Sequence, residues 1–548
     1  MYIYTHMYIG IQITFNFMMT NKIKQSNHIG CLQLYENKKL NRSVKIYRNK
    51  IYTCGRDIEC TIPIQGNQYI SSTHFKFWCT QFDSTYDPIV YVQDTSLNGT
   101  MYANEKRQII TKIRNKEILI VKNGTYLFFP HEAHLWDLEG DSVIMFKFFI
   151  EKKKISNKEN DEEHQRLLEV IKQENIEGNR WVFDNTFFGS GSFGVVCGCL
   201  DMHNQKKLTV CKIIKDTIMP VDKVNEKDFI LAYKKKFAKP PLLYSRVKNE
   251  KNIMQNLNHP NVVKFIGHYA TKTTYGDELD NGDVFWKSDY LIFQEQAFGG
   301  DLFSYLLDSK TLKLRSLPEA ECLLIIYQIM QALKYLHSQN LAHRDLKLDN
   351  VLLETPEKLS RIMLTDFGIA KQTPLRMKTC IGTPEYCAPE VGDFHKNTMR
   401  DIIRNKLNNK ENEEAVHFGY NKKCDIWSLG IIFYYLLTGK AFFEKKYDQG
   451  VMSGFDDYTL DDLQNWIYGK VLKCKKKLSI SHECIQFLNH LLTINEQNRH
   501  DILDCFKDRY IQGHKKSLDN IYRGILKSSR YNESVIPSGN KAKKRKIT

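Results

Sequence analysis

The chain of 548 residues is 42% hydrophobic and carries a formal net charge of +16, from 79 lysines and arginines and 63 aspartates and glutamates. This length and composition predict a soluble protein of several domains, each able to bury its own core. It shows neither a run of about 20 apolar residues nor a repeated Cys-x-x-Cys pattern among its 14 cysteines, which argues against a membrane span, a disulfide framework and a zinc site.

Residues 1–27 are rich in Tyr, Ile and Met, with polar residues such as His6, Gln12 and Asn16 among them. A secretory signal has a basic start and a smoother apolar core. We therefore expect a disordered extension, within which Met18 and Met19 are candidate starts of translation.

Residues 28–150 contain short strand-like runs that are separated by turn residues. The clearest runs are Ser43–Tyr47, Phe75–Trp78, Ile89–Val92 and Leu119–Val121. Runs of this length and spacing predict an all-β sandwich.

Three short motifs occur in the turns of this predicted sandwich: Gly55-Arg56, Ser71-Ser72-Thr73-His74 and Asp94-Thr95-Ser96-Leu97-Asn98-Gly99-Thr100. Loops at one end of a sandwich can direct an arginine and a serine at a phosphate group. In this order the motifs resemble the forkhead-associated (FHA) domain, a reader of phosphothreonine. The resemblance implies that Arg56 and Ser71 bind the phosphate and that Asn98 binds the peptide backbone. The alternative is a sandwich with ordinary turns, since Asn-Gly is a common hairpin signal.

Residues 151–178 are highly charged, as in Glu151–Lys154, and precede the region that begins at Trp181. This composition is typical of a solvated linker.

A glycine-rich segment opens the next region, and it consists of Phe188, Gly189, Ser190, Gly191, Ser192, Phe193, Gly194, Val195 and Val196. Glycines let backbone amides approach phosphate groups closely, although this pattern also occurs in dinucleotide-binding turns. Lys212 follows within the strand-like run Leu208–Ile214.

The stretch His343–Gly368 begins with a loop that lies between a predicted helix and a predicted hairpin. The apolar run Leu323–Leu336 has helical spacing and precedes this stretch, while Val351–Leu353 and Ile362–Leu364 are predicted strands within it. A loop between a helix and a hairpin can bring several polar groups to one point.

Phosphoryl transfer needs a carboxylate that orients the attacking hydroxyl, together with an amide and a second carboxylate that hold magnesium on the nucleotide. Asp345, Asn350 and Asp366 are residues of these types. The motifs His343-Arg344-Asp345-Leu346-Lys347-Leu348-Asp349-Asn350 and Asp366-Phe367-Gly368 resemble the catalytic loop and metal-binding motif of protein kinases. The resemblance implies catalytic roles for Asp345 and Lys347 and metal binding by Asn350 and Asp366.

The same resemblance implies a two-lobed α+β kinase domain over residues 181–511, with ATP and Mg²⁺ as cofactors. The glycine-rich segment and Lys212 would bind the phosphates, and the strand register favours Lys212 over Lys215. Glu250 would pair with Lys212, unless it belongs to an ordinary charged helix face. Glu295 and Ala297 would bind the adenine.

Other residues imply substrate preference. Lys347 and Thr383 match the serine/threonine form of the family. Asp301 and Asp349 stand where related kinases read an arginine three residues before the phosphorylated residue, and bidentate recognition gives that preference a physical basis. The alternative for both carboxylates is a plain surface charge.

The activation segment suggests self-phosphorylation. Thr379 stands where this class is phosphorylated, and Arg376 precedes it by the spacing inferred for substrates. We therefore hypothesise that one molecule phosphorylates Thr379 of another, and that the new phosphate pairs with Arg344.

The resemblance also implies structural roles. Asp425–Gly430 would form the helix that anchors the catalytic loop, and Arg499 would hold Glu390. The segments 216–246 and 391–420 are predicted inserts.

Residues 512–548 form a predicted basic tail. Its cluster Lys541–Lys546 is typical of a nuclear-import signal or a nucleic-acid contact, and the alternative is an ordinary charged tail. We expect import into the nucleus and no direct nucleic-acid binding.

A reader domain before a kinase domain resembles the checkpoint-kinase-2 class, and Val92–Thr100, Gly299–Leu306 and Gly382–Gly392 further resemble the meiosis-specific kinases of budding yeasts. The resemblance implies a chromosome-associated kinase that dimerises and binds phosphothreonine on a chromosome-axis protein. It also implies roles in interhomolog bias and the pachytene checkpoint. Two alternatives are a general DNA-damage effector kinase and a pseudokinase scaffold.

Overall fold

The computed structural model describes residues 28–36, 39–48, 50–65, 69–82, 86–104, 110–113, 115–129, 144–150, 168–169, 176, 178–191, 194–204, 207–220, 226–237, 242–271, 274–275, 279, 285–308, 311, 313–372, 383, 385–391, 420–443 and 459–531. The chain divides into two compact units. The first unit combines Met1–Tyr244, Ile266–Gly300 and Leu307–Lys313, and the second combines Ser245–Phe265, Asp301–Leu306 and Leu314–Thr548. The predicted extension of residues 1–27 lies outside the described residues.

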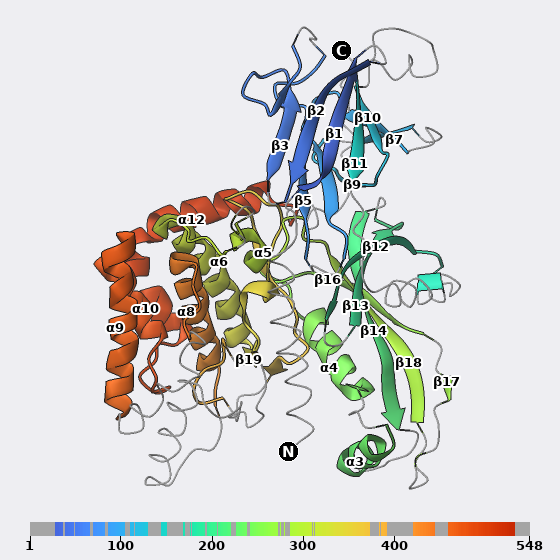
Figure 1. Ribbon diagram of the computed structural model, residues 1–548. Coiled ribbons are helices and arrows are strands. Elements are labelled where there is room, and N and C mark those ends of the chain that lie inside the picture. The colour runs from blue at the N-terminus through green and yellow to red at the C-terminus, as the bar shows by residue number, and fades with distance from the viewer. Residues whose placement is uncertain are drawn as a thin grey trace, which may run out of the picture. The chain divides into compact units, whose positions relative to one another are not determined.

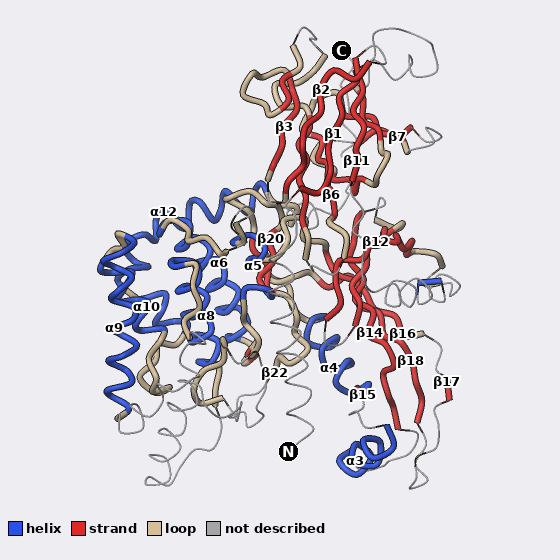
Figure 2. Tube along the Cα trace, in the orientation of Figure 1, coloured by secondary structure: helices blue, strands red, loops and turns tan. Residues whose placement is uncertain are grey.

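The N-terminal part of the first unit is a β-sandwich, drawn in blue to teal in Figure 1 and as red strands in Figure 2. The six-stranded sheet has the order β2-β1-β11-β10-β7-β8, formed by Lys39–Tyr47, His28–Glu36, Ile144–Ile150, Tyr126–Phe128, Thr100–Ala103 and Ile110–Ile113. The five-stranded sheet has the order β4-β3-β5-β6-β9, formed by Ile62–Pro63, Ile51–Gly55, Phe75–Thr80, Ile89–Asp94 and Ile118–Val121. The four strand-like runs of the sequence fall in β2, β5, β6 and β9, so the predicted sandwich is confirmed.

Apolar side chains from both sheets form the core of the sandwich. Phe75 and Phe77 of β5 meet Phe146 and Phe148 of β11 edge to face, with ring centroids 5.2 and 5.5 Å apart. Such a pair contributes about 0.5–1.5 kcal/mol beyond the area that it buries. The packed core fixes the two sheets and the loops at their ends.

The five-stranded sheet is buried on both of its faces. Trp78, Tyr91 and Ile120 lie on the face opposite the sandwich core, in a second cluster. This cluster also contains side chains from later in the first unit: Phe188, Val196, Leu208 and Phe298. Trp78 Nε1 donates a 2.9 Å hydrogen bond to the carbonyl of Phe298, and Gln296 Nε2 donates one of 2.9 Å to the Tyr91 hydroxyl. Strands that are apolar on both faces need cover on both, and the later residues supply it.

A seven-stranded sheet follows, in the order β12-β13-β14-β18-β16, with β15 beside β14 and β17 beside β18. Its strands are Trp181–Gly191, Gly194–Asp201, Lys207–Pro220, Phe285–Glu295 and Phe265–Ala270, then Leu242–Leu243 and Thr274–Tyr275. Leu168 and Ile176 are 1% and 2% exposed in its core, beside Trp181. Both residues come from the segment expected to be a solvated linker, so part of that segment is folded into the first unit.

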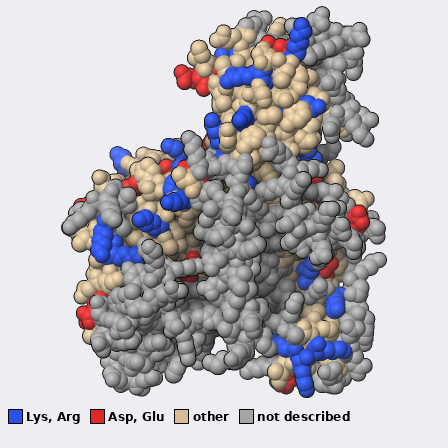
Figure 3. Space-filling model, viewed as in Figure 1, with Lys and Arg blue, Asp and Glu red and all other residues tan. Residues whose placement is uncertain are grey.

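The predicted insert at 216–246 extends this sheet. β14 continues to Pro220, and α3 (Glu226–Phe237) packs on the extension through a small core of Ile218, Phe229, Leu279 and Phe285. Lys234, Lys235 and Lys236 lie in the last turn of α3, where basic side chains gather in Figure 3.

The second unit is mainly helical. Its helices are α4 (Tyr244–Gln255), α5 (Leu302–Leu306), α6 (Glu319–Ser338), η2 (Leu348–Asn350), α8 (Lys423–Thr438), α9 (Leu460–Leu478), α10 (His482–Leu491), α11 (Ile502–Lys507) and α12 (Arg509–Ser528). Only the first residue of α4, Tyr244, is assigned to the first unit. The short strands of the second unit are β19 (Leu341–Ala342), β20 (Val351–Leu353), β21 (Ile362–Leu364) and β22 (Lys371–Gln372). The predicted helix is α6, and the two predicted strands pair as β20 and β21. Among helices in the described part of the chain, none has both the length and the apolar sequence that crossing a bilayer requires.

The helix α12 packs against α6 and the loop after α4. Tyr327 of α6 donates a 2.5 Å hydrogen bond to Asp519, and Tyr522 donates one of 2.6 Å to Asn261. The domain end predicted at Ile511 therefore lies inside a helix of the second unit, and the tail predicted from residue 512 begins with folded residues. An apolar stripe at helical spacing is buried: Tyr510, Ile511, Leu518 and Ile525.

Candidate functional site

The glycine-rich segment forms the end of β12, a turn and the start of β13. Gly191 and Gly194 are partners in the strand register, and the two residues between them lie outside the described part of the chain. A Cβ on Gly194 would collide with the carbonyl of Ile213. Glycine therefore allows β13 to approach β14 closely at the base of the turn.

Lys212 lies in β14, between β13 and β18. Its neighbours Cys211 and Ile213 are fully buried in the core of the sheet, so the alternation of the strand directs Lys212 to the other face. Lys215 lies within a register irregularity of β14. The geometry is consistent with the choice of Lys212.

The residues predicted to bind adenine lie at the end of β18 and just beyond it. Glu295 pairs with Thr209 of β14, and Ala297 is buried. Phe188, which precedes the glycine turn, is buried with its ring centroid 5.5 Å from that of Phe82. The aromatic cluster on the sandwich thus extends to the base of the glycine turn.

Asp345 is the centre of a hydrogen-bond network in the second unit. Its Oδ1 accepts from the backbone N–H of Thr383 at 3.0 Å and from the Thr383 hydroxyl at 2.7 Å. Its Oδ2 lies 3.0 Å from Lys347 Nζ and 3.0 Å from Asn350 Nδ2. The catalytic loop and the activation segment therefore meet at one carboxylate.

The ammonium group of Lys347 is held in its charged form. Burial would lower its pKa, but the carboxylates of Asp345, Asp349 and Asp366 raise the pKa above the ordinary value. Its Nζ also donates a 3.1 Å hydrogen bond to the Thr383 hydroxyl. A fixed positive charge thus lies beside the Asp345 carboxylate.

Asp425, at the start of α8, holds the backbone of the loop before Asp345. Its carboxylate accepts from the backbone N–H groups of His343 and Arg344 and from Nε2 of His337, each at 2.9 Å. Burial would raise the pKa of Asp425, but the hydrogen bond and charge of His337 bring the pKa below its ordinary value. The predicted anchoring role of this helix is confirmed.

Asp366 is linked to the catalytic loop through a buried imidazole. Nε2 of His343 lies 3.0 Å from the carbonyl of Thr365, and Asp366 itself has a left-handed φ of 63°. A Cβ on Gly368 would lie 3.2 Å from Glu250 Oε2 and 3.4 Å from Asp366 Oδ1. The carboxylates of Glu250 and Asp366 therefore both border Gly368.

Two oxygen-bearing side chains in and after the catalytic loop are suitable ligands for a hard cation. Asn350 Nδ2 donates to the carbonyl of Asp345 at 2.7 Å as well as to its carboxylate, which turns the amide oxygen away from Asp345. This oxygen and the carboxylate of Asp366 are the ligand types that Mg²⁺ prefers.

The predicted pair of Arg499 and Glu390 is confirmed. Arg499 Nη1 and Nη2 bind the two carboxylate oxygens of Glu390 at 2.6 and 2.9 Å. The guanidinium also donates to the carbonyls of Lys423, Thr493 and Ile494. This arginine ties the end of the activation segment to the helical core.

The two carboxylates predicted to read a substrate arginine have different surroundings. Asp301 is only 5% exposed, and it accepts from the backbone N–H of Ser304 at 2.7 Å and from its hydroxyl at 3.0 Å. It therefore caps α5. Asp349 is exposed in η2.

The loops predicted to bind phosphothreonine are joined by backbone hydrogen bonds. The N–H of Arg56 donates to the carbonyl of Ser71 at 2.9 Å, and the N–H of Asp57 donates to that of Ser72 at 3.0 Å. A Cβ on Gly55 would collide with the Ser72 carbonyl, so glycine permits this approach. Arg56 and Ser71 consequently lie on neighbouring backbones.

A third loop joins them through His74 and Asn98. Nδ1 of the buried His74 accepts from the N–H of Ser71 at 3.2 Å, and its Nε2 donates to the carbonyl of Gly99 at 3.0 Å. Asn98 Nδ2 donates to the carbonyl of Tyr69 at 2.9 Å. The three predicted phosphothreonine ligands therefore share one end of the sandwich.

Within two sets of predicted site residues, the described part of the chain does not fix the positions of the members relative to one another. Lys212 and Glu250 belong to different units, so their ion pair stays a prediction. Ser192, Phe193, Arg376 and Thr379 lie outside the described residues, as does the side chain of Ser190.

One contact was missed from the sequence. Arg344 Nε donates a 2.9 Å hydrogen bond to the hydroxyl of Tyr420. Tyr420 ends a long polar insert, and nothing in its sequence context marks it as a partner of the catalytic loop.

Comparison with known proteins agrees with this arrangement. The protein kinase domain model matches residues 184–511, and the FHA domain model matches residues 52–127. The meiosis-specific serine/threonine-protein kinase MEK1 of Saccharomyces cerevisiae is 33% identical over 491 residues, which cover 88% of this chain and 84% of that protein. The meiosis-specific serine/threonine-protein kinase mek1 of Schizosaccharomyces pombe is 28% identical over 484 residues, which cover 88% of this chain and 85% of that protein.

A third relative is not named as meiosis-specific. The ovarian-specific serine/threonine-protein kinase Lok of Drosophila melanogaster is 28% identical over 432 residues, which cover 77% of this chain and 70% of that protein. Protein kinases use ATP and Mg²⁺, and FHA domains bind phosphothreonine peptides. With both domain models matched in this order, the chain belongs to the family of serine/threonine protein kinases that carry an FHA domain.

Proposed function

We propose that Asp345 is the catalytic carboxylate with which this kinase phosphorylates serine and threonine in proteins. The observation that carries the proposal is its position between Lys347, Asn350 and Thr383. Asp345 orients the substrate hydroxyl toward the γ-phosphorus of ATP and accepts its proton, while the Lys347 ammonium offsets charge on the transferred group.

Nucleotide binding completes this mechanism. Asn350 and Asp366 would hold Mg²⁺, which would supply positive charge against the phosphates. Lys212, supported by Glu250, holds the α- and β-phosphates under the amides of the glycine-rich segment. Glu295 and Ala297 bind the adenine through the backbone.

Activation proceeds by dimerisation and phosphorylation of Thr379 by a second molecule. Full-length protein carrying Lys212→Arg and expressed alone is expected to lack phosphate on Thr379, because this side chain positions the nucleotide. Mixed with the active protein and Mg-ATP, the same variant is expected to gain the phosphate, as mass spectrometry of a size-tagged form would show.

Phosphate on Thr379 of the Lys212→Arg form expressed alone, in a host lacking other kinases, would contradict phosphorylation in trans. No phosphate on any threonine in either experiment would favour the pseudokinase scaffold.

Substrate selection follows from surface charge. We assign the preference for arginine at position −3 chiefly to Asp349, since it is exposed and Asp301 caps a helix. A guanidinium can bind a carboxylate in a bidentate manner.

The FHA domain recruits the kinase to phosphothreonine through Arg56, Ser71 and Asn98. Arg56→Ala in the full chain is expected to weaken binding of a phosphothreonine peptide by about 10- to 100-fold, the loss of a charged hydrogen bond. Fluorescence anisotropy of a labelled peptide measures this, with the unphosphorylated peptide as reference. Arg42→Ala, an exposed arginine on β2, is the matched control. Equal affinity of the two variants would remove Arg56 from the site.

The biological setting is proposed from the two relatives whose names call them meiosis-specific. We place this kinase in the nucleus at meiotic chromosomes, where it reads a chromosome-axis protein and acts in interhomolog bias and the pachytene checkpoint. The alternative is a general DNA-damage effector, and expression outside meiosis would favour it.

A further inference from the structure

A cluster of two histidines and one aspartate lies in the second unit, apart from the catalytic loop. His490 lies in the last turn of α10, His500 lies in the following loop, and Asp508 precedes α12. Nδ1 of His490 lies 2.7 Å from Asp508 Oδ2, and Nε2 of His500 lies 3.4 Å from the same oxygen. The two imidazole rings are nearly parallel, with centroids 4.4 Å apart.

The carboxylate of Asp508 is fixed by the helix that follows it. Its Oδ1 accepts from the backbone N–H of Tyr510 at 2.9 Å, in the first turn of α12. The side chain is 6% exposed, whereas those of His490 and His500 are 46% and 25% exposed. The second oxygen, Oδ2, is therefore directed at the two imidazoles, which solvent reaches.

We propose that His490, His500 and Asp508 form a binding site for a divalent transition-metal ion, with Zn²⁺ as the expected occupant. Each residue offers one ligand atom, and the three atoms lie within 4.8 Å of one another. Two imidazole nitrogens and one carboxylate oxygen are ligands that Zn²⁺ accepts, with water as the fourth.

Two of the three distances between ligand atoms are close to those of a tetrahedral zinc site, and the third, between the two imidazole nitrogens, is within 4.8 Å. Two ligands at about 2.05 Å from Zn²⁺ in a tetrahedral arrangement are about 3.3 Å apart. The separation of His500 from Asp508 already agrees with this, and His490 has to withdraw by about 0.6 Å from its 2.7 Å contact. Because His490 is the most exposed of the three, its side chain can make this adjustment.

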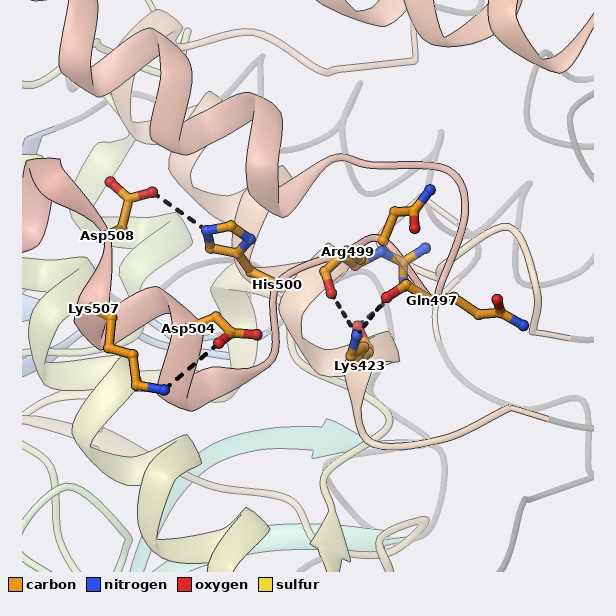
Figure 4. Close-up of a pocket in the computed structure, with 8 residues that line it drawn as sticks. Lys423, Gln497, Arg499, His500, Asp504, Lys507 and Asp508 are labelled. Atoms are coloured by element: carbon orange, nitrogen blue, oxygen red, sulfur yellow. Dashed lines mark hydrogen bonds and ion pairs between the residues drawn. The ribbon is translucent and has the colours of Figure 1, made fainter.

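The ion has a route to the cluster. His500 and Asp508 line a hollow of about 260 Å³ together with Lys423, Arg499 and Lys507, and Figure 4 shows His500 and Asp508 pointing toward one another there. The hollow gives room for the water ligand. The positive charges of Lys423 and Lys507 nearby repel a cation and so lower its affinity. Binding by the two histidines and the carboxylate has to exceed this repulsion.

Metal binding would join three segments of the second unit. His500 directly follows Arg499, which holds Glu390. The loop that carries Arg499 anchors the activation segment through Glu390. An ion at this site would therefore fix that loop to the end of α10 and to the start of α12. This is a structural site, since none of its residues contacts the Asp345 network in the described contacts.

The test uses full-length protein freed of metal by a chelator and titrated with ZnCl₂ against a chromophoric chelator. We expect one saturable site and a melting temperature that rises with zinc. His490→Gln and His500→Gln are each expected to weaken binding at least about tenfold. His482→Gln, an exposed histidine at the start of α10, should bind like the unaltered protein.

Zinc-edge X-ray absorption on the unaltered protein is a second measurement that needs no variant. The site predicts a first shell of nitrogen and oxygen only. Sulfur in that shell would place the ion on cysteines and overturn the proposal. Unchanged affinity in both histidine variants, or no saturable binding, would overturn it as well.

Discussion

Replacing Asp345 by asparagine is expected to lower the rate of phosphoryl transfer by about 10²- to 10⁴-fold, the usual contribution of a general acid–base group. The amide cannot accept the proton of the substrate hydroxyl. Its single oxygen can take the place of Oδ1 and still accept from Thr383, whereas its NH2 group takes the place of Oδ2 and loses the hydrogen bonds from Lys347 and Asn350. The link between the loop and the activation segment should therefore survive, and ATP affinity should change little.

The measurement is the steady-state rate with Mg-ATP and a threonine peptide that has arginine at position −3, together with nucleotide affinity. Asp461→Asn, an exposed aspartate in the first turn of α9, is the control and should retain full activity. A rate within threefold of the unaltered protein in the Asp345→Asn form would show that another group orients the hydroxyl.

Replacing Arg499 by alanine is expected to reduce the free energy of unfolding of the second unit by about 3–5 kcal/mol, since it leaves a partner charge unpaired in a buried site. The guanidinium is completely buried, and the Glu390 side chain is 11% exposed. Three backbone carbonyls would also lose their donor. Arg499→Lys should recover part of the loss, because it restores the positive charge beside Glu390. The recovery should be incomplete, because an ammonium group cannot bind both oxygens of Glu390 in the bidentate manner of a guanidinium.

Urea unfolding followed by circular dichroism measures the change. Arg523→Ala, an exposed arginine on α12, should shift the free energy by no more than about 0.5 kcal/mol. If Arg499→Ala unfolded at the same urea concentration as the Arg523→Ala form, the buried pair would not stabilise this unit.

The catalytic loop was predictable because its chemistry lies in one short stretch. Asp345, Lys347 and Asn350 are near neighbours in sequence, and the structure joins them directly. The partner of Arg344 was not predictable in this way. Tyr420 reaches it only after a long polar insert, and a single tyrosine carries no periodic signal.

Two segments that were predicted to be solvated contain buried residues. In the basic tail, Leu518 and Ile525 have the spacing of a buried helix face, and they lie on that face of α12. In the linker, Leu168 belongs to a short apolar run and Ile176 is a single apolar residue between polar ones, and the core around Trp181 shows that both are buried.

The sheet formed by β5, β6 and β9 has a consequence for how the protein can be divided. Its runs do not alternate between apolar and polar, because Trp78, Tyr91 and Ile120 need cover as much as the core residues between them do. Separating the sandwich from the later residues by a cut in the linker would expose Trp78, Tyr91 and Phe298 to water. Each half alone would expose an aromatic surface that promotes aggregation, so we expect the FHA and kinase domains to be more soluble when they are expressed together in one chain.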